Sequence, residues 1–304
     1  MLPPAGYDHA QAVRQILDEF SRLKFSIPNG QWTIVASFFL YETGGPSIKP
    51  IAIGTGTKCL PASRLPFQGE ALHDSHAEVL ARRAAIRWFI EEIGRAADGI
   101  YVSPWLFKTK EGLYALRDGV QLGLYVSTPP CGDSSTRFLA ALQDEQMAAL
   151  KDSATHSPID PSKASRGRDN YSLYGVLRTK PGRADSPSSS SMSCSDKIAA
   201  WTVLGIQGAV ASQLLSPVYI SAIVIGDVTP ELVRIVHEDC ERAFSNRLQG
   251  IAELPPAYSH RVPSVNFTPI PFPHSRIEVS AEDPLPGSSC NEGEKLKYLT
   301  LELY

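Results

Sequence analysis

Three short fragments of the sequence share side chains that commonly bind metal ions; they span residues 73–78, 129–133 and 193–197. Together they provide one imidazole, that of His76, and two thiols, those of Cys131 and Cys194. One neutral imidazole and two thiolates suit Zn²⁺, and three protein ligands leave the fourth tetrahedral position open to water. That arrangement is typical of a catalytic zinc site rather than a structural one.

Each fragment taken alone has a simpler interpretation. A His-x-Glu sequence on a helix is usually a solvated pair, a Pro-Cys turn usually contains a small buried thiol, and Cys194 after a serine run could be inert. The fragments share a further property, however, because His76 and Cys131 are predicted at helix starts and Cys194 close to one. The N–H groups and the dipole of a helix start favour a thiolate over a thiol, which promotes metal binding.

Glu78 is the candidate acid–base group. It follows His76 by two residues, so its side chain does not project in the same direction as the imidazole. In the first turn of a helix it can still reach a water on the metal and act as a proton shuttle. H-x-E together with P-C-x-x-C is typical of zinc nucleobase deaminases. Here Ser134 replaces the second cysteine of that pattern, so Cys194, far along the chain, must supply the third ligand.

Hydrophobic periodicity predicts the elements that position these fragments. Helices are expected at residues 8–24, 75–93, 134–151, 196–215 and 230–246. A hairpin is expected from strands at 32–41 and 48–58, with turn residues at 43–46, and further strands are expected at 120–127 and 218–226. The alternation of strands and helices predicts an α/β fold with a mixed central sheet flanked by helices.

Two regions lack the periodic apolar residues of a core. Residues 152–191 contain a serine run and several basic side chains, and we predict a long, partly mobile insertion there. After Glu253 the chain becomes rich in proline, and residues 281–294 are polar. The domain is therefore expected to span residues 1–277 and to be followed by an irregular tail at 278–304.

The composition excludes several classes of protein. With 304 residues, of which 43% are hydrophobic and 20% charged, the chain lies in the globular range and not in the disordered or collagen-like ranges. Its formal net charge of −3 gives no global positive field, so any nucleic-acid binding must use a local basic segment such as residues 166–183. Five widely spaced cysteines, an odd number, favour reduced thiols.

The sequence predicts neither a targeting segment nor a membrane span. Its first residues include Pro3, Pro4 and Asp8, where a signal peptide would need an apolar run. The longest apolar stretch, residues 218–225, is far shorter than the roughly 20 residues that span a bilayer. We therefore expect a soluble intracellular protein without a membrane partner, in the cytoplasm or the nucleus.

Four motifs in this order resemble the adenosine deaminases that act on RNA. They are residues 54–59 (GTGTKC), 73–83 (HDSHAEVLARR), 127–133 (STPPCGD) and 192–197 (MSCSDK). Residues 177–183 (LRTKPGR) and 73–75 are most similar to the tRNA-specific branch, which forms inosine beside the anticodon. The resemblance extends from about the N-terminus to Ile277, and it implies tRNA as the partner.

The resemblance implies a cytidine-deaminase-like core that binds Zn²⁺ through His76, Cys131 and Cys194. It implies that Glu78 is the general acid and base in the hydrolytic conversion of a flipped adenosine to inosine. It also places Thr57 and Lys58 near the flipped nucleotide and its phosphate. The simpler interpretation of this pair is an ordinary strand end with a solvated lysine.

The family also buries inositol hexakisphosphate, a polyanion, beneath the active site. The matching positions of this chain are Arg82, Arg83, Lys197 and Gln207, and Asp74 would link the polyanion to the surroundings of the metal. A buried cluster of cations needs a counter-charge, which such a ligand would supply. The alternative is that Arg82, Arg83 and Arg87 form a solvated helix face.

Two departures from the family pattern affect this polyphosphate pocket. Ala200 precedes Trp201 where the family has an arginine, and residues 281–304 do not resemble the C-terminal part that adds lysines and aromatic residues to the pocket. We therefore expect an incomplete pocket in a truncated or variant family member.

Two other functions remain as alternatives. One is a catalytically inactive, zinc-containing RNA-binding protein. The other is a free-nucleoside or cytidine deaminase, against which the missing second cysteine argues. The sequence leaves the oligomeric state open.

Overall fold

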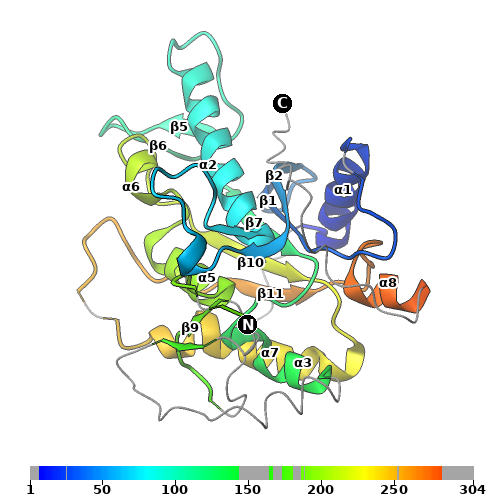
Figure 1. The fold of residues 1–304 in the computed structure, drawn as a ribbon. Helices are drawn as coiled ribbons and strands as arrows, with labels where there is room; N and C mark the ends of the chain where they lie inside the picture. Colours follow the sequence, from blue (N-terminus) through cyan, green and yellow to red (C-terminus); the bar gives the residue numbers. More distant parts are fainter. Residues whose placement is uncertain are drawn as a thin grey trace.

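The computed structural model (Figure 1) describes residues 7–24, 26–143, 164–166, 173–180, 186–187, 189–251 and 253–282. Its helices are α1 (His9–Arg22), α2 (Ala77–Ala96), α3 (Thr136–Ala141), α5 (Cys194–Leu204), α6 (Gly208–Ala211), α7 (Pro230–Phe244) and α8 (Arg276–Glu282). Short 3₁₀ turns are η1 (Ala62–Arg64), η2 (Asp133–Ser135) and η3 (Asn246–Leu248). The strands are β1 (Val35–Glu42), β2 (Ile48–Thr55), β3 (Thr57–Cys59), β4 (Asp74–His76), β5 (Leu106–Lys108), β6 (Tyr114–Leu116), β7 (Val120–Val126), β8 (Ser165–Arg166), β9 (Arg178–Thr179), β10 (Ile220–Ile225) and β11 (Ser264–Phe267).

Five strands form the central sheet, in the order β11-β10-β7-β1-β2. β1 pairs antiparallel with β2 and with β7, whereas β10 pairs parallel with both β7 and β11. The sheet is therefore mixed, and helices lie against it, which confirms the predicted α/β architecture. Parallel pairing also brings the carboxyl ends of β7 and β10 to the same edge of the sheet.

The β1–β2 hairpin shows why the sheet is covered on both faces. Side chains alternate along β1, so that Val35, Phe39 and Tyr41 join one apolar cluster while Phe38 and Leu40 join the other. The tight turn between the strands contains Gly44, whose φ of 77° is favourable for glycine.

Different helices cover the two faces (Figure 1). α1 is amphipathic and buries Val13, Ile16 and Phe20 on one face, and the Asp8 carboxylate caps its first turn by accepting hydrogen bonds from backbone N–H groups. Residues of α2, α5 and α7 share the larger apolar cluster on the other face. This cluster fixes the N-terminal ends of α2 and α5, which carry two of the predicted metal ligands.

The predicted helix at 196–215 is wrong as a single element. It begins earlier, at Cys194, and α5 ends at Leu204 because Gly205 adopts a φ of 72°. Gln207 folds back against this turn, since a Cβ on Gly205 would lie 2.2 Å from Gln207 Oε1. After this turn the chain forms the short helix α6. The apolar pattern of the sequence continues across the turn, so the positive φ of Gly205, and not the pattern, marks the end of α5.

The other boundaries differ in smaller ways. The predicted helix at 75–93 begins at Ala77, because the residues before it pair as β4. Of the predicted helix at 134–151, the structure shows α3, and residues 144–151 lie outside the described residues.

The region after Glu253 is more regular than expected. It adds β11 to the sheet edge, and residues 278–282 of the predicted tail are helical within α8. Residues 283–304 of that tail, with Cys290, lie outside the described residues, as does most of the predicted insertion at 152–191. The domain boundaries therefore stay a prediction.

Two further sequence expectations can be compared with the described part of the chain. Its four cysteines, Cys59, Cys131, Cys194 and Cys240, are all free thiols, as expected. Within the same residues, every helix is too short or too polar to cross a bilayer.

Candidate metal centre

Three elements that are distant in the sequence bring His76, Cys131 and Cys194 together. His76 ends β4 and occupies the N-cap position of α2, with an extended backbone that turns its side chain away from the helix axis. Cys131 lies in the turn after β7. Cys194 is the first residue of α5, whose N-cap Ser193 accepts a hydrogen bond from Asp196 N.

Gly132 allows the Cys131 turn to approach the start of α5 closely. Its φ is 111°, and a Cβ at this position would lie 2.2 Å from the Ser193 hydroxyl oxygen. Only a glycine fits between the two segments without displacing Ser193. As a result, Ser195 N can donate a 2.9 Å hydrogen bond to Cys131 O, and Cys194 N can donate one of 3.3 Å to Cys131 Sγ.

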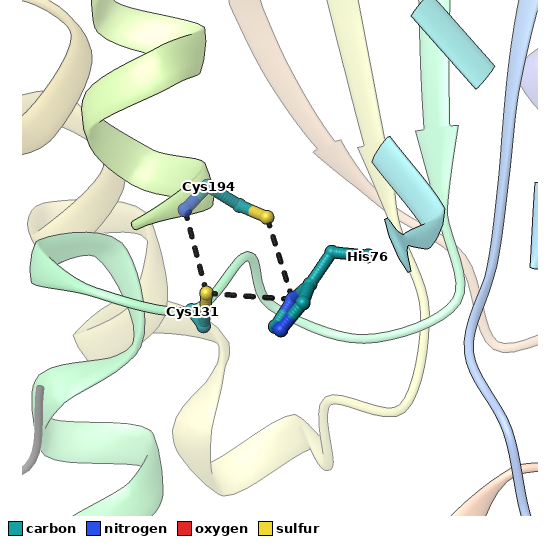
Figure 2. A group of neighbouring side chains, drawn as sticks. All are labelled: His76, Cys131 and Cys194. Carbon is teal, nitrogen blue, oxygen red and sulfur yellow. Dashed lines mark hydrogen bonds between the residues drawn. The ribbon is translucent and has the colours of Figure 1, made fainter. Parts of the chain in front are cut away.

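The spacing of the three side chains fits a single tetrahedral ion. Figure 2 shows them pointing toward one another, with Nδ1 of His76 3.7 Å from Cys131 Sγ and 3.6 Å from Cys194 Sγ. All three ligating atoms lie within 4.8 Å of one another. Tetrahedral Zn²⁺ with ordinary bond lengths requires about 3.6 Å between nitrogen and sulfur. The arrangement of these donors is therefore compatible with zinc.

The thiol of Cys131 has a lower pKa than that of Cys194. A hydrogen bond with Cys194 lowers the pKa of Cys131 well below its usual value, against the effect of burial, and the charges of Lys180 and His76 lower it further. Two adjacent thiolates without a cation would repel each other at this depth. A divalent cation would stabilise both, and for this reason thiolate ligands bind metal as they lose their protons.

Glu78 lies beside this group in the first turn of α2. Its side chain is 2% exposed, and Oε2 has no hydrogen-bond partner among the described residues. Burial raises the pKa of Glu78, and the neighbouring Cys131 raises it further. Buried polar atoms without a partner are uncommon in proteins, so the free oxygen indicates a place for a polar ligand or water.

Asp74 connects the metal ligands to two lysines. Lys180 Nζ donates hydrogen bonds to both carboxylate oxygens of Asp74, at 3.0 and 2.8 Å, and Lys197 Nζ is paired with the same carboxylate. The Ser191 hydroxyl donates to it at 2.7 Å. Burial alone would raise the pKa of Asp74, but Lys180, His76 and Lys197 hold it well below its usual range. Asp74 also accepts a 3.0 Å hydrogen bond from His76 N, which fixes the backbone of a ligand.

Lys180 was not predicted as a functional residue. It lies in a polar segment without periodicity, yet its side chain is only 2% exposed and its Nζ lies 3.2 Å from Cys194 Sγ. Burial would lower the pKa of Lys180, but Cys194, Cys131 and Asp74 raise it above the ordinary value. The sequence signal available for it was its place in the LRTKPGR motif.

The candidate polyphosphate residues are only partly brought together. Arg82 lies with its guanidinium carbon 5.3 Å from the centre of the Trp201 ring, and its Nε has no hydrogen-bond partner among the described residues. Lys197 precedes Trp201 by one turn of α5, so these two side chains lie on the same face of that helix. Arg82, which belongs to α2, contacts the same Trp201 ring. Arg83 is exposed on α2.

Gln207 differs from the other candidates. Its amide is occupied by backbone groups, since Nε2 donates to Leu204 O at 2.6 Å and Oε1 accepts from Val218 N at 3.1 Å. In this structure the hydrogen bonds of the Gln207 amide thus stabilise the turn between α5 and α6.

The candidate substrate residues lie next to the metal ligands. In the β3–β4 ribbon, Thr57 pairs with His76 and Lys58 pairs with Ser75. Paired strands are about 5 Å apart, so the backbones of Thr57 and His76 are neighbours. Both Thr57 and Lys58 are half-buried. The structure therefore places the backbones of these two residues next to β4, which ends at His76, with their side chains on opposite faces of the ribbon.

Comparison with known proteins finds one matching family. Residues 52–291 match the family described as adenosine-deaminase (editase) domain, and this range contains the metal ligands, Glu78 and the β3–β4 ribbon. The tRNA-specific adenosine deaminase 1 of Schizosaccharomyces pombe is 34% identical over 255 residues, which are 81% of this chain and 62% of that protein. The Saccharomyces cerevisiae protein of the same name is 30% identical over 295 residues, or 91% of this chain and 69% of that protein.

A second group of relatives acts on double-stranded RNA by name. The double-stranded RNA-specific editase B2 of Mus musculus is 30% identical over 220 residues, which are 70% of this chain and 28% of that protein. The chain thus spans about three fifths of the first tRNA relative and under a third of this editase.

Proposed function

Because the chain belongs to the adenosine-deaminase (editase) domain family, we propose that it catalyses the zinc-dependent hydrolytic deamination of adenosine to inosine in tRNA. The observation that carries this proposal is the convergence of His76, Cys131 and Cys194 beside a buried Glu78 with an unpaired oxygen. The names of several relatives support tRNA as the substrate. The LRTKPGR motif supports a target beside the anticodon.

The residues of the chain account for the proton movements of this reaction. A zinc ion bound by the three ligands would lower the pKa of water at its open position and so supply a nucleophile near neutral pH. Glu78 would accept the proton of that water at Oε2 and return protons to N1 of adenine and to the departing ammonia. Water adds at C6 as ammonia leaves, so adenosine and water become inosine and ammonia.

The β3–β4 ribbon would hold the flipped nucleotide. Lys58 carries a positive charge that suits the phosphate, and the Thr57 side chain can hydrogen-bond to the ribose or the base. Their pairing with Ser75 and His76 fixes the backbone of both residues relative to His76. This supports a role for Thr57 and Lys58 in orienting adenosine at the metal.

Deamination of a tRNA transcript by the purified protein tests the proposal. Inosine should form with the parent and should fall by at least about 100-fold with Glu78→Gln, which keeps the shape but not the base. Glu91→Gln, on the same helix but paired with Arg87 at the surface, is the matched control and should retain activity.

Two other outcomes would assign a different function. Zinc and tRNA binding without inosine would favour a catalytically inactive RNA-binding protein. Faster release of ammonia from free adenosine or cytidine would favour a nucleoside deaminase.

We also propose that a polyanion such as inositol hexakisphosphate binds against α2 and α5. Arg82 with its unpaired Nε, the exposed Arg83 and Lys197 support this, whereas Ala200 contributes no charge. Protein purified from cells that make inositol phosphates should release the compound on acid denaturation, detected by mass spectrometry. Arg82→Ala should release less than Arg87→Ala, whose side chain is paired with Glu91. Absence of any released polyphosphate, with no thermal stabilisation on its addition, would contradict the proposal.

A further inference from the structure

The loop that joins β3 to β4, residues 60–73, connects the strand with Thr57 and Lys58 to the strand that ends at His76. It begins directly after Cys59, the last residue of β3, and ends three residues before His76. A 2.8 Å hydrogen bond from Leu60 N to His73 O closes its base, and the β3–β4 pairing continues from there to His76. Its position is therefore set by the same ribbon that positions a metal ligand.

This β3–β4 loop is ordered by its own hydrogen bonds while it faces solvent. Arg64 N donates to Pro61 O at 3.0 Å in the turn η1, and Gln68 N donates to Glu70 Oε2 at 3.2 Å. Gly69, with a φ of 78°, allows the sharp turn at the far end. A loop that is already shaped loses little entropy when it binds a partner.

Phe67 is the most exposed large apolar side chain among the described residues. Its relative exposure is 106%, so the ring contributes nothing to either apolar cluster. Leaving a ring of this size in water is unfavourable relative to burying it. Single exposed apolar residues are common, so the exposure of Phe67 acquires meaning only from its place in a loop whose base adjoins the strand that ends at His76.

The charges of this ribbon and loop suit an anionic partner. Residues 57–76 contain two cations, Lys58 and Arg64, and two acids, Glu70 and Asp74, of which Asp74 is buried and paired with Lys180 and Lys197. Glu70 accepts a hydrogen bond from the loop backbone, while Arg64 lies exposed three residues before Phe67. An aromatic ring next to cations, without hydrogen-bond readout, is the combination by which proteins bind unpaired nucleotides.

We propose that Phe67 stacks on an unpaired base of the RNA next to the reacting adenosine, and that Arg64 contacts the adjoining phosphate. This inference rests on the proposed function, because a flipped adenosine leaves the face of its neighbour without a stacking partner. The Phe67 ring replaces that lost stacking. The β3–β4 loop is thus a substrate-binding element that favours adenosines in single-stranded loops over those in continuous helices.

Binding of the full-length chain to an anticodon stem-loop RNA tests the inference without requiring turnover. Phe67→Ala should weaken the affinity by about 5- to 100-fold, at every salt concentration, and Phe67→Trp should restore it. Arg64→Ala should instead reduce the slope of log affinity against log salt by about 0.7. These two effects separate stacking from charge.

Ile100→Ala is the matched control. Ile100 is 88% exposed but lies beyond the far end of α2, a helix of 20 residues that spans about 30 Å. This variant should bind RNA as the parent does. A 2-aminopurine placed beside the target adenosine should lose fluorescence on binding to the parent or to Phe67→Trp, and should keep it with Phe67→Ala.

The outcomes distinguish failure of this inference from failure of the proposed function. If the parent forms inosine and Phe67→Ala binds RNA with the parental affinity, the stacking role is wrong and the deaminase activity stands. If Phe67→Ala alters self-association instead, with unchanged RNA affinity, the ring serves a protein contact and the inference is also overturned. If the parent neither binds nor deaminates RNA, the proposed function fails and the inference fails with it.

Discussion

Lys180 donates a 3.2 Å hydrogen bond to the sulfur of Cys194, a candidate metal ligand. The same ammonium group is paired with the Asp74 carboxylate at 2.8 Å, and both side chains are buried. One cation therefore compensates a carboxylate and a ligand sulfur that are both shielded from water. This contact links the metal centre to the charges on α5, because Lys197 also pairs with Asp74.

Replacing Lys180 should weaken metal binding as well as the fold. In Lys180→Met the buried Asp74 loses a partner, and we expect the free energy of unfolding to fall by about 3–5 kcal/mol. Zinc affinity should fall by about 10- to 100-fold, as found when groups that support a ligand are removed. Chelator competition and urea unfolding measure the two effects.

Lys197→Met is the control for Lys180, since both lysines pair with Asp74 but only Lys180 has a hydrogen bond to Cys194 Sγ. Lys197→Met should lower the free energy of unfolding and leave the zinc affinity closer to that of the parent. Equal zinc affinity in the parent and in Lys180→Met would show that the sulfur contact has no effect on the ligand.

Gly132→Ala should disturb the metal centre through the backbone. The added Cβ would meet the Ser193 hydroxyl, which caps α5 directly before Cys194. We expect a loss of about 2 kcal/mol or more in unfolding free energy, from strain and the lost cap, together with weaker zinc binding. Gly94→Ala on α2 meets nothing within 4 Å and should stabilise the protein slightly, by up to about 1 kcal/mol. Normal zinc content in Gly132→Ala would contradict this explanation.

Metal removal should abolish activity reversibly. A chelator that strips zinc removes the cation that Cys131 and Cys194 would bind, and deamination should return when Zn²⁺ is added. Metal analysis should find one zinc per chain in the parent and much less than one in Cys131→Ser. Cys59→Ser should keep the full complement, because Cys59 contacts Ser189 and not the three ligands. Loss of zinc from Cys59→Ser as well would mean that the ligand set is wrong.

Asp227 should make stability fall as pH rises. Burial raises the pKa of Asp227 to about 7, and the charge of Glu278 adds to this while a hydrogen bond from Ser275 opposes it. The folded protein therefore binds the proton more tightly than the unfolded chain, in which the pKa of aspartate is about 4. The contribution of this group is fully present below about pH 4 and is lost as pH rises to about 7.

Asp227→Asn tests this pH dependence. Asparagine tolerates the φ of 54° at this position and carries no charge. The melting temperature of the variant should exceed that of the parent at pH 8 and approach it at pH 4. A difference that did not depend on pH would exclude titration of Asp227 as its cause.

The candidate metal ligands could be predicted from the sequence because each lies in a short motif, two of them at helix starts and one in the turn after a strand. His76 and Cys194 adjoin helix starts that hydrophobic periodicity locates to within a few residues, and Cys131 follows a clear strand. Donor chemistry then restricts the choice, since few combinations of side chains suit zinc. Glu78 followed from its place in the first turn of the helix that begins after His76.

Other features depend on conformations that residue patterns do not encode. The periodic apolar residues continue past Gly205, so the break between α5 and α6 was missed, and with it the structural use of the Gln207 amide. Lys180 lies in a segment without periodicity, where a lysine is normally solvated. Its burial follows from long-range pairing with Asp74, 106 residues earlier in the chain.

The chain separation of the metal ligands has a consequence for the order of folding. Cys131 lies 55 residues after His76, and Cys194 lies 118 residues after it. Contacts between such distant segments form late, after local units such as the β1–β2 hairpin, because closing long loops costs entropy first. A nascent chain would therefore hold zinc only weakly until α5 docks. Tight metal binding would therefore require that the region up to α5 has been synthesised and folded, and the bound metal would then stabilise that region.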